Sequence, residues 1–239
     1  MLLDSKSIGE RQYSPRAREP LASHTGLGLP YRLEVTITTV SMRKLFPSEG
    51  TRLRDHLGRL TREQRSLRFM GSLDDAAVAR HCERLNWIRT VVIGFFDAGE
   101  LRGAAELQVV DGHFPILCEA AITVEAAWQN RGVATELLRR ALVIARNRSA
   151  RAVQINTFGD NYRIQHVAQK FGAHFRYRAG ESEAQIPTPA PTYWSLCEEI
   201  TDDGLGWMSF WFDQISRATK AGDASEDHPL RSHLHRSIP

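Results

Sequence analysis

The sequence predicts a single α/β domain with a polar tail at each end. A β-hairpin pattern occupies 90–110, and a strand pattern at 116–124 gives way to an amphipathic helix at 131–146. The 239 residues exceed the common size of one domain, yet α/β domains of this length occur as single units. Hydrophobic residues make up 42% of the chain and charged residues 25%, which allows a sizeable core and excludes wholesale disorder.

Charge and cysteine content exclude several classes of protein. Lys plus Arg number 31 and Asp plus Glu 28, and the resulting charge of +3 gives little support for nucleic-acid binding. The three cysteines share no metal-ligand spacing, so neither a disulfide framework nor a metal site is expected. No apolar run could span a membrane, and the N-terminus does not resemble a signal peptide. We therefore expect a cytoplasmic protein without nucleic-acid or membrane partners.

The first part of the chain predicts an arm, a strand and several helices. Residues 1–30 mix Ser, Pro, Gly and charges, which indicates a flexible arm. The β-branched residues of Tyr31–Val40 alternate as in a half-buried strand. Apolar residues then recur at helical spacing between 53 and 85, where Ser72 and Asp74 offer N-caps.

Strands and helices alternate in the rest of the domain. The hairpin is expected to turn at Asp97-Ala98-Gly99-Glu100 and to lead into the strand that ends at Val124. After the helix at 131–146, the patterns predict a strand, a helix closed by Gly172, and two short strands. These elements are expected at 153–157, 161–171, 174–177 and 184–186.

An aromatic-rich segment follows the domain. Apolar, mostly aromatic residues between Leu205 and Ile215 predict a helix that is apolar around most of its circumference. Because a solvated helix would not be so apolar, we expect a cover: the domain itself, a second copy in a homodimer, or a membrane surface. The predicted units are thus a domain, a helical extension and a disordered tail, at 31–190, 191–219 and 220–239.

The segment Gln129–Thr135 connects a strand to a helix in a way that suits an anion. The first backbone N–H groups of a helix are unpaired and carry a partial positive charge. A loop without bulky side chains lets a pyrophosphate reach these donors, and Gly132 would allow that close approach. By itself the pattern is short, and an ordinary helix start with a convenient glycine would explain it as well.

The context of this segment resembles a known family. Gln-x-x-Gly-x-Ala at 129–134, after a strand ending at Val124, resembles the acyl-CoA signature of the GNAT superfamily of N-acetyltransferases. Asn161 opens the next helix and Gly172 ends it, which is similar to the superfamily's second cofactor-contacting segment. The resemblance covers 31–187 and is strongest to the acetyltransferase domains of bacterial protein lysine acetyltransferases.

This resemblance implies a fold and a co-substrate. The fold would be a mixed, strongly bent sheet, split between its fourth and fifth strands, with helices on both faces. Acetyl-CoA would bind with its pantetheine arm in the split, paired with the strand backbone as an added strand would be. The implied cofactor-binding residues are Ile122, Thr123, Val124, Gln129, Asn130, Arg131, Gly132, Val133, Ala134, Thr135 and Asn161.

Acetyl transfer to an amine requires a base, because an ammonium with a pKa of about 10.4 has no free lone pair at neutral pH. Glu119 lies on the strand beside the expected thioester, and the resemblance places the family's general-base glutamate there. Alternatively, Glu119 is a solvent-facing or salt-bridged residue and Glu106 acts through a water. Glu125 is expected to support the turn, and Cys118 to face the opposite side of the sheet as a packing residue.

The sequence departs from the family pattern at one position. Many GNAT enzymes carry a tyrosine four residues before the glycine that ends the second cofactor helix, whereas this chain has Ala168. Tyr162 lies in the first turn, where its hydroxyl would point elsewhere. The prediction is therefore acetyl transfer by direct attack of a protein lysine or a small-molecule amine, and the alternative is a non-catalytic module that senses acyl-CoA. The segment 53–85 should wall the acceptor groove, with Arg65, Arg68 and Arg80 favouring an acidic acceptor if they point inward.

Overall fold

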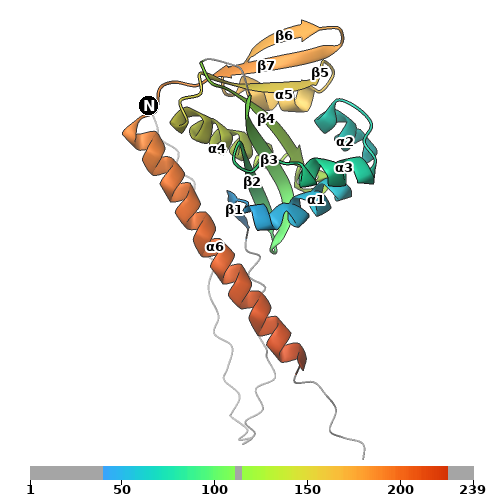
Figure 1. The fold of residues 1–239 in the computed structure, drawn as a ribbon, viewed down its shortest axis with the longest axis vertical. Coiled ribbons are helices and arrows are strands. Elements are labelled where there is room, and N and C mark those ends of the chain that lie inside the picture. The colour runs from blue at the N-terminus through green and yellow to red at the C-terminus, as the bar shows by residue number, and fades with distance from the viewer. Residues whose placement is uncertain (1–39, 111–114, 226–239) are drawn as a thin grey trace, which may run out of the picture. The chain divides into compact units, whose positions relative to one another are not determined.

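The structure, a computed structural model, describes residues 40–110 and 115–225. The expected arm, nearly all of the expected first strand, the residues of the second turn and the last part of the expected tail lie outside these ranges. The described residues form a seven-stranded mixed sheet with helices on both faces (Figure 1). The predicted fold class is therefore confirmed.

The strands follow the order β1-β2-β3-β4-β5-β7-β6 across the sheet. All neighbours are antiparallel except β4 and β5, which are parallel. Their bounds are β1 Ser41–Lys44, β2 Thr90–Asp97, β3 Glu100–Val110, β4 Leu117–Val124, β5 Ala152–Phe158, β6 His174–Arg178 and β7 Glu181–Pro187. The first described strand is thus β1, which begins one residue after the expected strand ends.

The helices are α1 Gly50–Arg59, α2 Arg62–Phe69, α3 Asp75–Glu83, α4 Val133–Asn147, α5 Tyr162–Gln169 and α6 Tyr193–Ser225, with short 3-10 turns η1 Pro47–Glu49 and η2 Ala126–Trp128. Local side chains set their starts. Asp74 accepts a hydrogen bond from the backbone N–H of Ala77 at 2.7 Å and caps α3, as expected. Thr61 and Gln64 cap α2 reciprocally.

The turn between β2 and β3 has the backbone conformation of a tight hairpin. Ala98 and Gly99 have φ angles of 50° and 73°, and both lie in the left-handed region. Two-residue turns of this kind match the right-handed twist of the flanking strands, which explains the Gly at the second position. The predicted hairpin is confirmed, with a register shift between Phe95 and Phe96.

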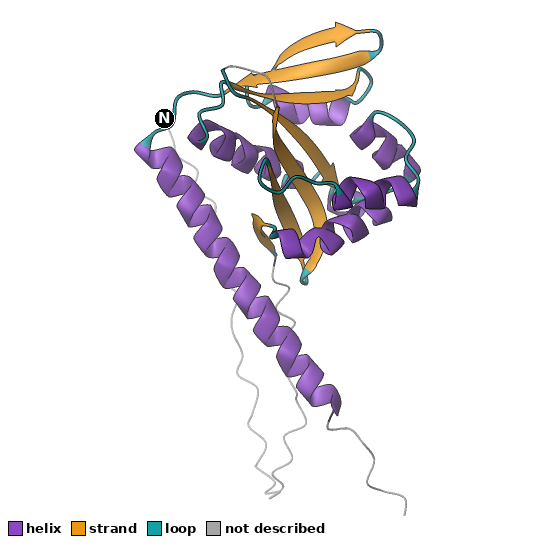
Figure 2. Cartoon of the chain, viewed as in Figure 1, coloured by secondary structure: helices purple, strands orange, loops and turns teal. Residues whose placement is uncertain are grey.

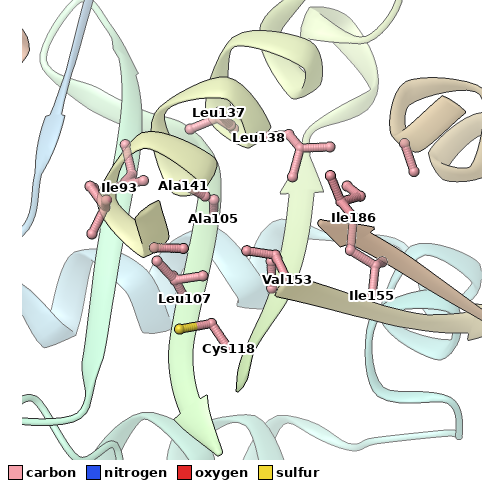
Figure 3. Close-up of a cluster of buried hydrophobic side chains, with 14 of the residues drawn as sticks. Ile93, Ala105, Leu107, Cys118, Leu137, Leu138, Ala141, Val153, Ile155 and Ile186 are labelled. Carbon is pink, nitrogen blue, oxygen red and sulfur yellow. The ribbon is translucent and has the colours of Figure 1, made fainter. Parts of the chain in front are cut away.

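Two apolar cores lie on opposite faces of the sheet. On one face α4 packs Leu137, Leu138 and Ala141 against the strands (Figure 3). On the other face α1 packs Leu53 and Leu57 against β2 and β3. Each fully buried leucine contributes about 2 kcal/mol of transfer free energy, so the two cores fix helices on both sides of the same strands.

The sheet is split between β4 and β5. These strands pair over only three residues each, Leu117–Glu119 with Ala152–Gln154. Beyond Glu119, β4 continues along β3, while β5 stays with β7. Figure 2 shows that β5, β7 and β6 run at a large angle to β2, β3 and β4. The split that the family resemblance implied is therefore present.

Helix α6 contacts β1 and α4 mainly through charged side chains. Lys44 of β1 binds Glu199 and Asp203 at 2.5 and 2.8 Å. On α4, Arg139 pairs with Asp202 at 2.9 Å. Gly206 allows close approach, because a Cβ there would lie 2.5 Å from the Cβ of Arg43. Polar pairing therefore holds α6 against the domain.

The aromatic side chains of α6 are less covered than expected. Trp207 and Trp211 are 47% and 60% exposed, and Trp194 is 79% exposed. Trp207 contacts the Phe46 ring at a centroid distance of 4.8 Å, which accounts for its partial burial. The expectation that the domain itself covers this helix is wrong for these side chains, because its charged face takes the domain contact. None of the helices in the described ranges is long and apolar enough to cross a bilayer.

Candidate active site

A cleft of about 790 Å³ opens where β4 and β5 separate. Its walls come from α2, the end of β4, the start of α4, β5 and α5. Its volume is in the range of small-molecule sites. All of the predicted cofactor-binding residues except Arg131 line it, namely Ile122, Thr123, Val124, Gln129, Asn130, Gly132, Val133, Ala134, Thr135 and Asn161. Arg131 is exposed beside it.

The start of α4 leaves backbone donors available in this cleft. Gly132 is the N-cap, with a φ of 81°, and Asn130 has a φ of 59°. A Cβ at Gly132 would meet nothing within 4 Å, so the left-handed backbone, and not packing, requires glycine here. Gly132 has no side chain that could cap the helix, so the first N–H groups keep their partial positive charge toward the cleft. This end of α4 suits an anion.

Gln129 braces the loop before α4. Its Nε2 donates to the carbonyl oxygen of Val124 at 2.8 Å, and its Oε1 accepts from Arg163 Nη1 at 2.7 Å. Trp128 donates from Nε1 to Asp97 Oδ2 at 2.8 Å, which anchors the loop to the hairpin turn. The Gln129 amide therefore uses both ends within the protein and shapes the site.

The edge of β4 presents backbone groups to the cleft. Glu125 N–H donates to the carbonyl oxygen of Arg102 in β3. Because backbone groups of successive strand residues point to opposite sides, those of Ile122 and Val124 face away from β3 and toward the split. Of these groups, the carbonyl of Val124 is already bonded to Gln129. The backbone of Ile122 and the N–H of Val124 remain the edge that an extended ligand could join.

Thr123 differs from its neighbours because its side chain joins a buried polar network. His56 is fully buried; its Nε2 lies 2.9 Å from Thr123 Oγ1 and its Nδ1 3.1 Å from Glu125 Oε1. Glu125 also accepts hydrogen bonds from Arg59 and Arg102. Burial raises the pKa of Glu125, but the bonds from His56 and Arg59 outweigh it and lower the pKa. The Glu125 side chain thus joins the end of β4 to α1 and β3, and it does not cap the turn η2 that follows.

Sequence analysis did not single out His56. The residue lies on α1 on the same side as Leu53, Leu57 and Leu60, which are all buried. A histidine on the apolar face of a helix signals a buried polar partner, since a buried imidazole needs hydrogen bonds. The sequence could therefore have indicated that His56 has a partner, although not which one.

Glu119 lies at the last residue pair of β4 and β5, where the split begins. Its Oε1 accepts a hydrogen bond from Asn156 Nδ2 at 3.2 Å, and Asn156 Oδ1 accepts from Gln154 Nε2 at 2.8 Å. Asn156 lines the cleft, and so does Ala121, two residues from Glu119 on the same face of β4. Among the described residues no cation pairs with Glu119. Glu119 itself is not among the residues that line the cleft; its partly buried carboxylate lies next to it, in contact with the lining residue Asn156.

Cys118 faces the other side of the sheet. It is fully buried in the core under α4 (Figure 3). Burial raises the pKa of its thiol, which keeps it protonated and unreactive. The predicted packing role of Cys118 agrees with this position. No group of three or more side chains that could hold a metal ion occurs in the described part of the chain.

Glu106 is engaged on both oxygens. Its Oε1 accepts from Arg68 at 2.8 Å, and its Oε2 lies 2.8 Å from His81 Nε2. Burial raises the pKa of Glu106, but the charge of Arg68 and the hydrogen bond from His81 outweigh burial and lower the pKa to about 2. A carboxylate with so low a pKa is a weak proton acceptor. Glu106 therefore anchors α2 and α3 on β3 and is poorly suited to serve as a base.

The ion pair between Glu106 and Arg68 should make the free energy of unfolding depend on pH in the acidic range. The Glu106 pKa is about 2 in the folded chain and ordinarily 4.5, so its contribution is present above pH 4.5 and is lost as the pH falls toward 2. We expect Glu106→Gln to lower the free energy of unfolding at pH 7 by about 3 kcal/mol and to remove this acid-dependent loss. Urea unfolding at pH 7, 4.5 and 3 measures both. Glu63→Gln, at an exposed position, should change stability by less than about 0.5 kcal/mol. Equal acid losses in wild type and Glu106→Gln would contradict this account.

Asn161 and Tyr162 lie on the wall formed by α5. The Asn161 side chain does not cap the helix; its Nδ2 donates to Thr157 Oγ1 at 2.8 Å. Contact of Asn161 with a ligand stays a prediction. Tyr162 is 74% exposed and is among the residues that line the cleft. Ala168 is fully buried, so no hydroxyl occupies the position of the family tyrosine.

The family model described as Acetyltransferase (GNAT) family matches residues 53–173, about half of the chain. The chain belongs to the GNAT family. It is therefore an acetyl-CoA-dependent N-acetyltransferase, as the resemblance of residues 129–134 implied. The match runs from the first turns of α1 through β2–β5, α4 and α5, and thus includes every wall of the cleft.

Solved structures share the fold of this GNAT protein. The GNAT domain of S. lividans PAT has a TM-score of 0.53 at 20% identity and covers 61% of this chain and 89% of that one. A putative acetyltransferase from Acinetobacter baylyi has a TM-score of 0.54 at 13% identity, covering 65% and 97%. A putative acetyltransferase from Salmonella typhimurium, solved with its cofactor acetyl-CoA, has a TM-score of 0.50 at 13% identity, covering 65% and 99%. Among curated proteins none matches significantly.

Proposed function

We propose that this GNAT protein transfers the acetyl group of acetyl-CoA directly to a primary amine, with Glu119 as the general base. The observation that carries the proposal is the position of Glu119. Glu119 lies where β4 and β5 separate, and its carboxylate is held by Asn156, which lines the cleft. A carboxylate here can take a proton from an amine directly or through one water.

Acetyl-CoA fits the cleft at two places. Its pyrophosphate would lie at the uncapped start of α4, where Gly132 leaves backbone donors open. Its pantetheine arm would lie along β4, where the backbone of Ile122 and the N–H of Val124 face the split. Asn161 would add a polar contact from α5. An arm bound along β4 toward Glu119 brings the thioester to the base.

The reaction follows from these positions. An ammonium gives a proton to Glu119, and the free amine attacks the thioester carbonyl carbon. The new C–N bond forms, and the attacking nitrogen, which becomes positively charged, loses its second proton to water. The C–S bond breaks, and its electron pair leaves on sulfur as the coenzyme A thiolate. Because Ala168 cannot protonate that thiolate, backbone donors and helix starts have to stabilise it. Glu119 returns its proton to solvent before the next cycle.

The acceptor is proposed to be cationic, a protein lysine or a small-molecule amine. Helix α2 forms one wall of the cleft, as expected, but two of its arginines, Arg65 and Arg68, are neutralised. Arg68 pairs with Glu106 at 2.8 Å, and Arg65 pairs with Asp75 at 2.5 Å. These two arginines therefore do not favour an acidic acceptor. Glu63 is exposed on the same wall and suits an approaching ammonium.

Amine-dependent cleavage of acetyl-CoA tests this proposal. The purified protein is incubated with acetyl-CoA and separate pools of peptides and small amines, and mass spectrometry identifies acetylated acceptors while free thiol is measured. We expect thiol release only with an amine. The alternative, a module that senses acyl-CoA without catalysis, rests on Ala168. Tight acetyl-CoA binding without thiol release in any pool would favour that alternative.

A further inference from the structure

We propose that Asn156 is a positioning residue that orients the Glu119 carboxylate, and that Gln154 in turn fixes the direction of the Asn156 amide. The inference rests on the proposed role of Glu119 as the base. It gives two residues of β5 a role in orienting the base, in addition to the residues proposed to contact the cofactor.

The three side chains lie on one face of the sheet across the split. Gln154 and Asn156 are two residues apart on β5 and therefore point to the same side. Gln154 is the register partner of Glu119 in the last pair of β4 and β5. Asn156 is the next residue on that face beyond the last pair, where β4 and β5 no longer pair. Its side chain reaches from β5 to Glu119 on β4, beyond the point where the two backbones pair.

The hydrogen bonds among Gln154, Asn156 and Glu119 all run from donor to acceptor in the same order. Gln154 Nε2 donates to Asn156 Oδ1 at 2.8 Å, and Asn156 Nδ2 donates to Glu119 Oε1 at 3.2 Å. An amide has a donor end and an acceptor end of nearly equal shape, so its partners decide which end points where. The donor from Gln154 holds the Asn156 oxygen, which leaves the Asn156 N–H groups toward Glu119.

This direction suits a base. An ionised carboxylate is only an acceptor, and a hydrogen bond to it favours the charged form, which is the form that can take a proton. With Oε1 held by Asn156, the other carboxylate oxygen is left for the amine or its water. Asn156 is half-buried and lines the cleft, so it acts at the site and not in the apolar core.

Three variants test the hydrogen bonds that run from Gln154 through Asn156 to Glu119. Asn156→Leu keeps the approximate volume and removes the donor, and Asn156→Asp places a second carboxylate beside Glu119. Gln154→Met leaves Asn156 in place and frees its amide to turn over. We expect each variant to disfavour the ionised form of Glu119. Asn156→Leu removes the donor to the carboxylate and Gln154→Met lets that donor turn away, whereas Asn156→Asp adds a second negative charge and should have the largest effect. Acetyl-CoA affinity, measured by calorimetry, should stay within about threefold of the wild type.

Two readouts separate positioning from a structural role. The first is the acidic limb of the pH profile of kcat/KM with one fixed amine, whose midpoint should move upward in the order Gln154→Met, Asn156→Leu, Asn156→Asp. The second is a carbon NMR titration of the Glu119 carboxyl in the free protein, assigned by comparison with Glu119→Gln. This titration needs no turnover and remains measurable in a slow variant that folds.

The outcomes distinguish this inference from the proposed function. If the limb disappears in Glu119→Gln but keeps its midpoint in all three variants, the positioning role is wrong and the base assignment stands. If the NMR pKa rises in the variants while the limb does not move, the contact exists but Glu119 is not the base, and both proposals fail. A general loss of acetyl-CoA affinity in all three variants would show a structural role and overturn the inference.

Discussion

Glu119→Gln should lower turnover at neutral pH by about 10²- to 10⁴-fold while acetyl-CoA binds nearly as in the wild type. The amide keeps the shape of the carboxylate and can still contact Asn156, but it cannot accept a proton. This loss corresponds to about 3 to 5 kcal/mol of activation free energy. Steady-state kinetics with the acceptor found by mass spectrometry and calorimetry with acetyl-CoA measure the two effects separately.

The pH profile adds a signature that misfolding would not give. The wild-type rate should rise with pH as Glu119 ionises, whereas the variant should lack that limb and recover partly at high pH as free amine becomes abundant. Glu63→Gln is the matched control, because it removes a carboxylate from the acceptor wall without touching the proposed base. We expect it to raise KM for a cationic amine and to keep the limb. Wild-type turnover and pH profile in Glu119→Gln would remove Glu119 from the mechanism.

If Glu119→Gln were silent, Glu106 would be a poor replacement. Both of its oxygens are engaged by Arg68 and His81, and its pKa is lowered to about 2. A water or the exposed Tyr162 hydroxyl on the cleft wall would then need testing. Loss of both turnover and acetyl-CoA affinity would instead indicate that Glu119 supports the split itself.

Gly132→Asp should abolish acetyl-CoA binding under conditions in which the wild type is saturated. The carboxylate would lie at the start of α4, where it accepts hydrogen bonds from the same N–H groups and repels a pyrophosphate. The fold should persist, because a Cβ at this position meets no atom within 4 Å and Asp tolerates a left-handed backbone better than most residues.

Gly132→Asn separates charge from shape. Asn has nearly the same size, shares the tolerance of a positive φ and carries no charge. We expect a clearly smaller loss of affinity for Asn than for Asp, with the difference shrinking at high salt as screening grows. Calorimetry at two salt concentrations and circular dichroism of each variant provide the comparison. Unchanged affinity in a folded Gly132→Asp variant would mean that the pyrophosphate does not bind at this helix start.

Much of the fold follows from local sequence. The pair Ala98-Gly99 specifies a tight turn, and Asp74 caps α3 through its own neighbours. Alternation puts Cys118 and Glu119 on opposite faces of β4 whatever the rest of the chain does. Elements of this kind depend on residues within a few positions of each other, so the sequence predicts them without knowledge of the packing.

The sequence alone also predicted most of the residues of one cleft, because Gly132 and its neighbours combine a left-handed backbone conformation with a recognisable order of residue types. What it could not decide is which distant side chains meet. Glu106 meets Arg68 and His81, and His56 meets Glu125, across 25 to 69 positions of sequence. Such pairs exist only after the helices pack, and they decide which carboxylates are engaged and which one can act as a base.

Helix α6 is a second case in which the sequence predicts an element but not its contacts. The aromatic content of 205–215 predicted a helix covered by the domain, a second copy or a membrane surface, but Trp207 and Trp211 are 47% and 60% exposed. Glu199, Asp202 and Asp203 pair with Lys44 and Arg139, so charge and not apolar area holds it to β1 and α4. A helical pattern fixes which residues share a face. Which face makes the contact depends on partners more than fifty positions away, and only the tertiary structure brings them together.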